Sequence, residues 1–471
     1  MNITGREKEK LILKKCLTSG APEFLAVYGR RRVGKTFLIR EFFNGKLDFY
    51  VTGLASEKMT DQLHAWNTAI SNCFGGSDNS AANWIDAFAL LRKKLEKPKK
   101  SKRKIIFIDE APWLDTPKSG FMVALEHFWN GWASGRSDIF LIVCGSATSW
   151  IVKKLLKNKG GLHNRVTQRM RLLPFTLKET EEYLKEKEFN FGRYRICEAY
   201  MIFGGVPYYL SLLGKGLSLP QNIDALCFDD DGSLRGEFEE VYSTLFKNSD
   251  KYIKVVTTLS SKLKGLTRDE IIRDSGLASG GGLTQILNEL EICGFIRAYP
   301  NYLMDDNLCI YQLVDPFSLF YLRFINGKRP KNPRFWTSNL DSPSLSAWKG
   351  YAFERVCISH SEQIKQALGI AAISTETSSW RSRTASPGTQ IDLLLDRKDN
   401  IINLIEIKYS KSEYTISVQE ESNLRKRIAA FETETRTKKA VHLTMVTTYG
   451  IVNNNHSGIV HSEVTLDALF R

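Results

Sequence analysis

The sequence predicts an α/β protein of several domains, the first of them organised around a parallel sheet. Three observations indicate this class. The chain has 471 residues, which is more than one hydrophobic core ordinarily organises. Its first half alternates apolar strand patterns with amphipathic helical patterns, as in parallel sheets that carry helices on both faces. Its C-terminal part has a second α/β pattern, and a mostly helical middle separates the two.

The composition narrows the functional classes. Hydrophobic residues make up 42% of the chain, as in globular proteins. No apolar run reaches the ~18–20 residues that a membrane helix needs, and the charged start, Met1–Lys10, lacks the apolar core of a signal peptide. The eight cysteines are scattered without a Cys-x-x-Cys pair, so neither a zinc site nor a disulfide framework is expected. We therefore expect a cytoplasmic protein that does not enter the membrane.

The formal net charge of +14 suggests a nucleic-acid partner. The distribution of the charge weakens this interpretation, because the segment 92–104 alone holds nine Lys or Arg residues and one Glu. The excess therefore lies mostly in one loop and not on a basic face. This loop either contacts phosphates or is a solvated linker, and the sequence leaves both open.

The segment 23–43 predicts a phosphate-binding loop. An apolar strand pattern leads into Gly-Arg-Arg-Arg-Val-Gly-Lys-Thr and then into an amphipathic helix. The glycines let backbone N–H groups turn toward phosphate oxygens, Lys35 reaches the β- and γ-phosphates, and Thr36 offers its hydroxyl to Mg²⁺. The helix start adds its positive dipole end. We expect ATP and Mg²⁺ here, with the nucleotide bound by Gly29, Arg30, Arg31, Arg32, Val33, Gly34, Lys35, Thr36 and Phe37.

Two further strands are expected to complete the nucleotide site. In the segment 104–114 an apolar run ends in Asp109 and Glu110. Asp109 can hold the magnesium, and Glu110 can polarise the attacking water as a general base. The segment 139–150 contains Ser146, which is placed to sense the γ-phosphate; the local sequence equally allows an ordinary helix N-cap there.

Hydrolysis of ATP usually needs a mobile cation as well. The segment 162–175 offers Arg165, Arg169 and Arg171 just before a predicted helical lid. We favour Arg165, although any of the three can instead pair with surface acids. An arginine finger that acts on a neighbouring copy would imply a homo-oligomer.

The order of these motifs resembles the archaeal-type ATPases of the STAND/AAA-like P-loop class. The matching stretches run from ITGREKEKLIL through VYGRRRVGKTFLI, IIFIDEAPWL, VCGSATSWI and NRVTQRMRLLPF to FGGVPYYL. The resemblance implies a P-loop ATPase core over 1–175 and a helical lid over 176–245. It also implies that Arg6 and Pro207 lie near the nucleotide.

A winged helix is predicted over 246–326. The segment 251–300 has three helical patterns separated by glycine-rich turns, and two strand patterns form the wing. The candidate recognition helix, 281–293, carries no Lys or Arg, whereas helices that read DNA usually carry cations. We therefore interpret this module as a packing or signalling element that can meet a protein partner, and we expect any DNA contact to be independent of base sequence.

After a linker over 327–344, a C-terminal domain over 345–471 is predicted with the order α-β-β-β-α-β. Two of its strands form a hairpin that carries charged residues within apolar runs. Because side chains alternate along a strand, Glu406 and Lys408 share one face, and Asp392 on the partner strand can lie beside Glu406. Glu354, on the preceding helix, can hold metal-bound water from a third direction.

This order and the spacing Glu354…Asp392…Glu406-x-Lys408 resemble the PD-(D/E)XK nuclease superfamily, whose domains have the restriction-endonuclease-like fold. Ile391 stands in place of the usual proline before the aspartate. Asp392, Glu406 and a backbone carbonyl make a hard-oxygen site suited to Mg²⁺ or Mn²⁺. Lys408 is expected to orient and help deprotonate a metal-held water.

Several functions stay open at this stage. The leading one is an ATPase whose nucleotide state gates a metal-dependent DNA nuclease-like domain. A rival is a nucleotide-dependent interaction switch, whose last domain is a scaffold for a partner, and a third is a DNA motor that does not cut. In the blandest interpretation, Glu406 and Lys408 are a surface ion pair and Asp392 is an ordinary polar residue.

Overall fold

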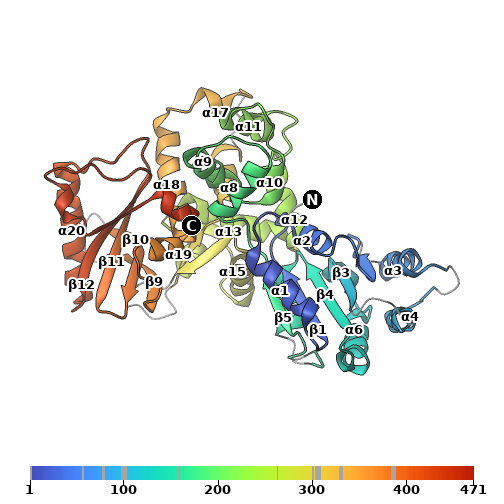
Figure 1. Ribbon diagram of the computed structural model, residues 1–471. Coiled ribbons are helices and arrows are strands. Elements are labelled where there is room, and N and C mark those ends of the chain that lie inside the picture. The colour runs from blue at the N-terminus through green and yellow to red at the C-terminus, as the bar shows by residue number, and fades with distance from the viewer. Residues whose placement is uncertain are drawn as a thin grey trace. The chain divides into compact units, whose positions relative to one another are not determined.

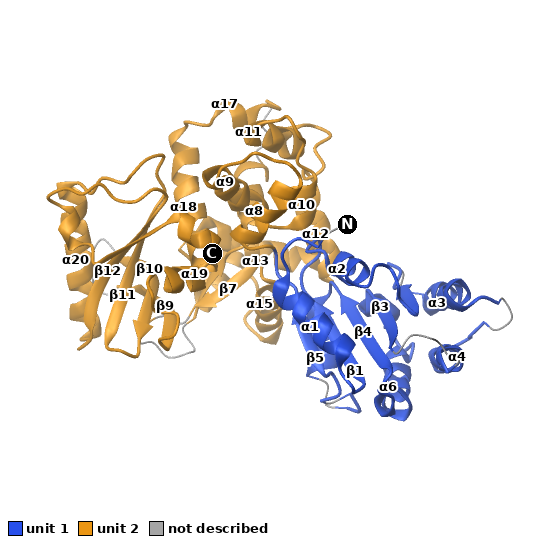
Figure 2. Ribbon diagram, in the orientation of Figure 1, with its two compact units in different colours: residues 1–174 blue, residues 175–471 orange. Residues whose placement is uncertain are grey.

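The computed structural model describes most of the chain, namely residues 3–55, 58–76, 80–96, 103–157, 160–162, 164–262, 264–299, 302, 309–327, 332–382 and 389–471. The chain divides into two compact units, residues 1–174 and 175–471 (Figure 2). The middle of the basic loop, 97–102, lies outside the described residues. Among the helices of the described ranges, none is both long enough and apolar enough to cross a membrane.

The first unit is built on a parallel sheet of five strands in the order β2-β3-β4-β1-β5. The predicted parallel α/β sheet is thus confirmed. β4 separates β1, which precedes the glycine-rich loop, from β3, which ends in Asp109. This order places the carboxyl ends of β3, β4 and β1, which lead into polar residues, side by side. The strands are β1 (Glu23–Tyr28), β2 (Phe49–Thr52), β3 (Lys104–Asp109), β4 (Ile139–Gly145) and β5 (Gln168–Arg171).

Helices cover both faces of this sheet, because alternate strand residues face opposite sides and both sets are apolar. One face, with Leu25 and Val27, packs against α1 (Glu7–Thr18) and α2 (Lys35–Phe42). The other face, with Phe24, packs against three helices, α3 (Met59–Phe74), α4 (Trp84–Leu95) and α6 (Phe121–Gly131). Shorter elements are α5 (Ala111–Leu114), η1 (Ala133–Gly135), α7 (Thr148–Trp150) and the π-helical η2 (Ile151–Leu156).

The second unit begins with helices, as expected for the lid segment. α8 starts with a capping box in which Thr176 and Glu179 satisfy each other's backbone N–H groups. Gly205 has φ 65°, and a Cβ there would lie 2.2 Å from the carbonyl oxygen of Phe175, so the turn before α10 requires glycine. The helices are α8 (Leu177–Glu186), α9 (Arg193–Phe203), α10 (Pro207–Ser211), α11 (Leu219–Ile223), η3 (Asp224–Phe228) and α12 (Glu237–Leu245).

The next segment has the element order that the winged-helix prediction requires. A three-stranded antiparallel sheet in the order β6-β8-β7 accompanies three helices. α15 coincides with the candidate recognition helix and carries no cation. The elements are α13 (Ser249–Ser261), β6 (Leu266–Thr267), α14 (Arg268–Ser275), α15 (Gly281–Cys293), β7 (Ile296–Tyr299) and β8 (Ile310–Leu313), followed by α16 (Pro316–Phe324).

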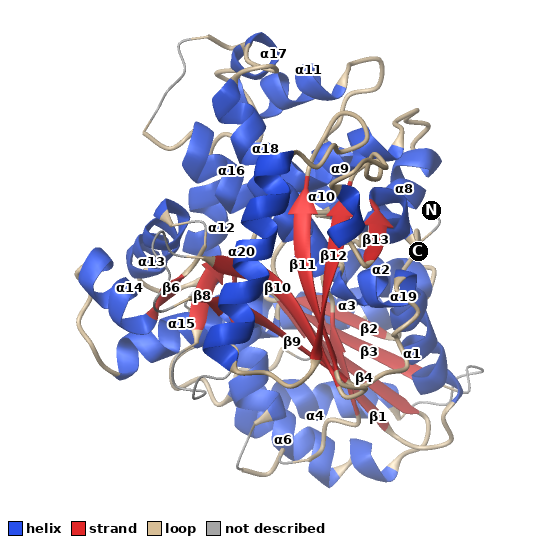
Figure 3. Cartoon of the chain, turned by 90° about the vertical axis from the view of Figure 1, so that its left-hand side faces the viewer, coloured by secondary structure: helices blue, strands red, loops and turns tan. Residues whose placement is uncertain are grey.

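The C-terminal segment forms a second five-stranded sheet in the order β13-β12-β11-β10-β9. β9, β10 and β11 are antiparallel neighbours, and β12 joins β11 in parallel after α20. α18 and α19 lie on one side of this sheet and α20 on the other (Figures 1 and 3). The elements are α18 (Pro343–Ser359), α19 (Ser361–Ala367), β9 (Thr375–Arg381), β10 (Gln390–Arg397), β11 (Ile401–Lys408), α20 (Val418–Thr435), β12 (Ala440–Thr447), η5 (Ser457–Ile459), β13 (Ser462–Thr465) and η6 (Leu466–Phe470).

The predicted linker 327–344 is not a free connector in its described part. Within it, α17 (Phe335–Ser338) buries Trp336, and the buried carboxylate of Asp224 accepts hydrogen bonds from the backbone N–H groups of Trp336 and Thr337. One continuous hydrophobic cluster runs through the lid, winged-helix and C-terminal segments. A proline- and asparagine-rich composition suggested a spacer, but aromatic burial anchors it.

Candidate functional site

The glycine-rich loop leaves β1 at its carboxyl end and leads into α2. Gly29 (φ 151°) and Gly34 (φ 87°) have backbone conformations that other residues rarely adopt. A Cβ at Gly29 would lie 2.1 Å from the carbonyl oxygen of Leu172, so only glycine fits between the loop and the chain that follows β5. The buried Lys35 ammonium donates to the carbonyl oxygens of Gly29 (3.0 Å) and Arg30 (2.9 Å). It therefore lies inside the loop, where the phosphates of a nucleotide would bind.

The predicted magnesium ligands lie together. The Thr36 hydroxyl donates to Oδ2 of Asp109 at 2.6 Å. Burial raises the pKa of Asp109, the hydroxyl of Thr36 opposes that shift, and the charge of Glu110 adds to it. A hydroxyl and a carboxylate at the end of a phosphate-binding loop fit Mg²⁺, which would supply positive charge at the phosphates when bound.

Ser146 connects the loop to the predicted base. Its N–H and hydroxyl donate to the two carboxylate oxygens of Glu110, at 3.0 and 2.5 Å, and its oxygen accepts from the Lys35 ammonium at 3.1 Å. The alternative role as a helix N-cap is wrong, since α7 begins at Thr148 after Ala147 and no side chain caps it. Because β4 lies between β1 and β3, Ser146 reaches both neighbours.

The candidate arginine finger, Arg165, lies at the end of the sheet opposite to the phosphate-binding loop. β5 runs parallel to β1, with Gln168 beside Leu25 and Arg171 beside Tyr28, the residue before the loop. Arg165 precedes this pairing, so it lies near the amino ends of the strands, and it is exposed. An action of Arg165 on a nucleotide bound to its own first unit is therefore not supported; an action on a neighbouring copy stays a prediction. Arg171 is the arginine at the nucleotide end.

The other residues that were predicted to contact the nucleotide do not all lie at the loop. The guanidinium of Arg6 donates to the carbonyl oxygens of Leu173 (2.8 Å) and Val33 (3.3 Å). It therefore connects the loop to the chain that follows β5. Phe37 is exposed on α2. Pro207 begins α10 in the second unit, and its place near the nucleotide stays a prediction. Of the three loop arginines, one is buried and two are half-buried: Arg30, Arg31 and Arg32.

In the second unit, the hairpin β10–β11 brings the predicted acidic residues to adjacent positions. Leu393 pairs with Ile405, and Asp392 and Glu406 are the residues next to this pair on the two strands. Oδ1 of Asp392 accepts from the Gln390 amide at 2.8 Å. The Lys408 ammonium lies 3.1 Å from Oε1 of Glu406, so the two residues share a face as the alternation predicts.

Glu354 on α18 completes the acidic group. Burial and the negative charges of Asp392 and Glu406 raise the pKa of Glu354 to about 8. The positive charge of Arg355 opposes this shift in part. The charges of two strand carboxylates therefore reach Glu354 on the helix and oppose its ionisation. Lys264, from the turn before β6, also acts on Glu354, and its carbonyl oxygen lies 3.5 Å from the Gln390 amide.

Lys408 does not have the properties of a base. Burial by itself lowers the pKa of the Lys408 ammonium, but the carboxylates of Glu406 and Glu420 outweigh burial and raise this pKa well above its usual value. The ammonium lies 2.7 Å from a carboxylate oxygen of Glu420. The predicted role in deprotonating water is therefore not supported, and Lys408 supplies a fixed positive charge.

The donor set permits a divalent cation but is not a preformed cage. Within the described ranges, no group of three or more His, Cys, Asp or Glu side chains is arranged to hold a metal ion. Asp392 and Glu406 would be the two protein ligands, and both oxygens of Glu406 are engaged by cations, Lys408 and Arg427. A metal would have to take the place of one of them.

The first part of the chain is similar to a known family of proteins. Residues 3–213 match the family described as an ATPase domain predominantly from Archaea. This part of the chain is similar to archaeal-type ATPase domains. An uncharacterized protein of Methanocaldococcus jannaschii is 23% identical over 412 residues, which cover 86% of this chain and 87% of the relative.

Among solved structures, the Walker-type ATPase of Pyrococcus abyssi covers 68% of this chain and 96% of its own, with 20% identity and a TM-score of 0.50, which indicates a shared fold. A STAND protein with a tetratricopeptide repeat sensor from Pyrococcus horikoshii covers 78% of this chain and 50% of its own, with 17% identity and a TM-score of 0.31. The nucleotide site described above lies within residues 3–213, the part that matches the ATPase family.

Sequence reasoning missed three residues of the C-terminal site: Gln390, Glu420 and Arg427. Gln390 stands two positions before Asp392, so strand alternation could have placed it on the same face. Glu420 and Arg427 are seven positions apart on α20, two helical turns, and so point to the same side. Nothing in the local sequence says that this side meets β11.

Proposed function

We propose that this ATPase couples ATP hydrolysis to a metal-dependent nuclease-like domain that acts on DNA without base preference. The observation that carries the proposal is the pair of hairpin carboxylates, Asp392 and Glu406, whose charges act on Glu354 of α18, with the ammonium of Lys408 on Glu406. The order α-β-β-β-α-β around these residues supports the same function.

Each residue has a defined part in this proposal. Asp392 and Glu406 hold the divalent cation, which when bound would lower the pKa of water and stabilise charge on the scissile phosphate. Glu354 stays protonated near neutral pH and can hydrogen-bond to water at the site. Lys408 stabilises negative charge that develops on the phosphate.

One comparison tests the nuclease. Supercoiled plasmid and single-stranded DNA are incubated with Mg²⁺ or Mn²⁺, with and without ATP, using wild-type protein and Asp392→Ala. Cleavage by the wild type that is lost in Asp392→Ala supports the proposal. Absence of cleavage under every nucleotide condition contradicts it.

Gating by the nucleotide is a separate part of the proposal. It requires that ATP bind one conformation of the protein more tightly than another. Small-angle scattering of the full chain with and without a non-hydrolysable ATP analogue measures this, with Lys35→Met as the control that does not respond. Identical scattering curves for the wild type would argue against gating.

A second candidate function is an ATP-operated interaction switch with a non-cleaving C-terminal scaffold. The engagement of both Glu406 oxygens by Lys408 and Arg427 favours it, because the acidic site is then satisfied without a metal. The absence of Lys and Arg from α15 fits a module that contacts protein. This switch predicts that DNA neither stimulates ATP hydrolysis nor is cut.

A further inference from the structure

Helix α20 reaches the acidic site with two side chains, seven residues apart. Arg427 pairs with Oε2 of Glu406, and Lys408 pairs with Oε1 of the same carboxylate. Glu420 accepts from the Lys408 ammonium at 2.7 Å and from the Tyr414 hydroxyl. α20 therefore engages both the predicted metal ligand and the lysine beside it.

A guanidinium and a divalent cation cannot occupy the same carboxylate oxygen. The Glu406 side chain is only 16% exposed, so the two positive charges would repel each other with little screening by water. Entry of a cation at Oε2 of Glu406 would therefore displace Arg427, whereas entry at Oε1 would displace Lys408. The side chain of Arg427 is 32% exposed, which gives the displaced guanidinium a way out toward solvent.

After displacement, Arg427 remains anchored on α20 within one side-chain length of the bound cation. A phosphate group that meets the cation would lie within its reach. The planar guanidinium fits two phosphate oxygens at once, which makes arginine well suited to this contact.

We propose that Arg427 is a phosphate-binding residue that competes with the divalent cation for Glu406. It pairs with the carboxylate while the metal is absent and turns to a DNA phosphate when the metal enters. This inference rests on the proposed nuclease-like function of the same site.

The two parts of the proposal predict opposite effects of one substitution. Arg427→Gln removes the competitor, so Mn²⁺ binds about tenfold more tightly. The same change removes a phosphate contact, so DNA binds more weakly and the slope of log K against log salt falls by about one. A residue with only a structural role would weaken both kinds of binding when replaced.

Arg425→Gln is the matched control, because Arg425 lies on the same helix, is 64% exposed and pairs with Glu421 at 2.7 Å. Mn²⁺ binding to the full chain without nucleotide is followed by the loss of the free Mn²⁺ resonance signal. DNA binding is followed by the fluorescence anisotropy of a labelled duplex in Ca²⁺ at several salt concentrations. Arg427→Lys keeps the positive charge but lacks the planar guanidinium that contacts two phosphate oxygens at once. Its Mn²⁺ affinity should therefore stay near that of the wild type while its DNA affinity falls.

The outcomes separate the inference from the function on which it rests. Tighter Mn²⁺ binding together with weaker DNA binding in Arg427→Gln, with neither change in Arg425→Gln, supports the inference. If Asp392→Ala loses Mn²⁺ but Arg427→Gln binds it no more tightly than Arg425→Gln, competition by Arg427 is refuted while the metal site stands. If Asp392→Ala binds Mn²⁺ as tightly as the wild type, the metal site is absent and both proposals fail.

Discussion

His360 connects α8 of the predicted lid to α18, the helix that carries Glu354, by hydrogen bonds. We expect this connection to weaken at acidic pH. The ring is 2% exposed; its Nε2 accepts from the Leu177 N–H at 3.1 Å, and its Nδ1 lies 2.8 Å from the Val356 carbonyl oxygen, to which it donates. Burial lowers the pKa of His360 from 6.5 to about 4. A protonated ring could not accept from Leu177, so the connection between α8 and α18 depends on the neutral form.

The size and sign of the effect follow from this pKa. The unfolded chain binds a proton near pH 6.5 and the folded chain only near pH 4. The stability contributed by neutral His360 is therefore present above pH 6.5 and is lost as the pH falls through this window. The loss is about 2 kcal/mol between pH 7 and pH 5 and about 3 kcal/mol in full.

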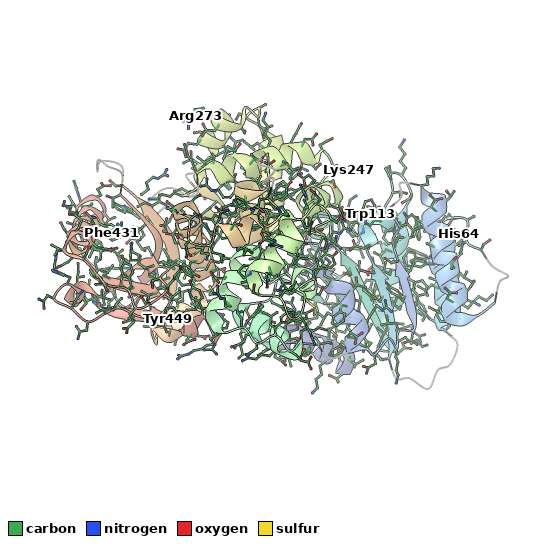
Figure 4. All side chains as sticks on the ribbon, turned by 90° about the horizontal axis from the view of Figure 1, so that it is seen from above. His64, Trp113, Lys247, Arg273, Phe431 and Tyr449 are labelled. Atoms are coloured by element: carbon green, nitrogen blue, oxygen red, sulfur yellow. The ribbon has the colours of Figure 1, made fainter. Side chains whose placement is uncertain are left out.

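The perturbation is His360→Gln, whose side-chain oxygen can still accept from Leu177 but does not titrate. Hydrogen exchange of peptides from α8 and α18 gives the local opening free energy of wild type and variant at pH 7, 6 and 5. We expect the opening free energy of the wild type to fall relative to that of the variant as the pH falls, because only the wild type loses the contribution of neutral His360. His64→Gln, which changes an exposed histidine on α3 (Figure 4), is the control. Parallel pH profiles for wild type and His360→Gln would refute the argument.

Three further predictions concern the two sites. Gly29→Ala should lower the melting temperature of the first unit more than Gly34→Ala, because a Cβ at Gly29 meets the Leu172 carbonyl whereas a Cβ at Gly34 has nothing within 4 Å; calorimetry ranks the two, and equal losses would contradict the reasoning. Glu110→Gln should keep ATP binding but lower the hydrolysis rate by a factor of about 100 or more, as phosphate release and a fluorescent ATP analogue measure; a small loss of rate would exclude Glu110 as the base. With a pKa of about 8, raised by burial and neighbouring carboxylates, Glu354 should contribute stability that is lost as the pH rises from its usual range near 4.5 through 8. A protonated-carboxyl infrared band that disappears between pH 7 and 9, and is missing in Glu354→Gln, checks this; a band already absent at pH 6 would contradict it.

The nucleotide site was largely predictable because its chemistry is local in sequence. A strand, eight loop residues and a helix specify the loop, and an apolar run that ends in two acids specifies Asp109 and Glu110. The choice between two roles for Ser146 was not local. It depended on β4 lying between β1 and β3, because only that order brings Ser146 to Lys35 and Glu110 at once. The same sheet register removed support for Arg165, which no reading of single residues could do.

The sequence by itself determined the phosphate-binding loop, the two acids of β3, and the shared face of Glu406 and Lys408, since these depend on spacing within one segment. Only the tertiary structure decided what surrounds them. α20 brings Arg427 and Glu420 to β11, burial and two neighbouring acids keep Glu354 protonated, and Glu406 with Glu420 keeps Lys408 an ammonium ion. The physical reason is that a side chain's charge state depends on solvent exclusion and on charges from distant segments, and folding alone places these around it.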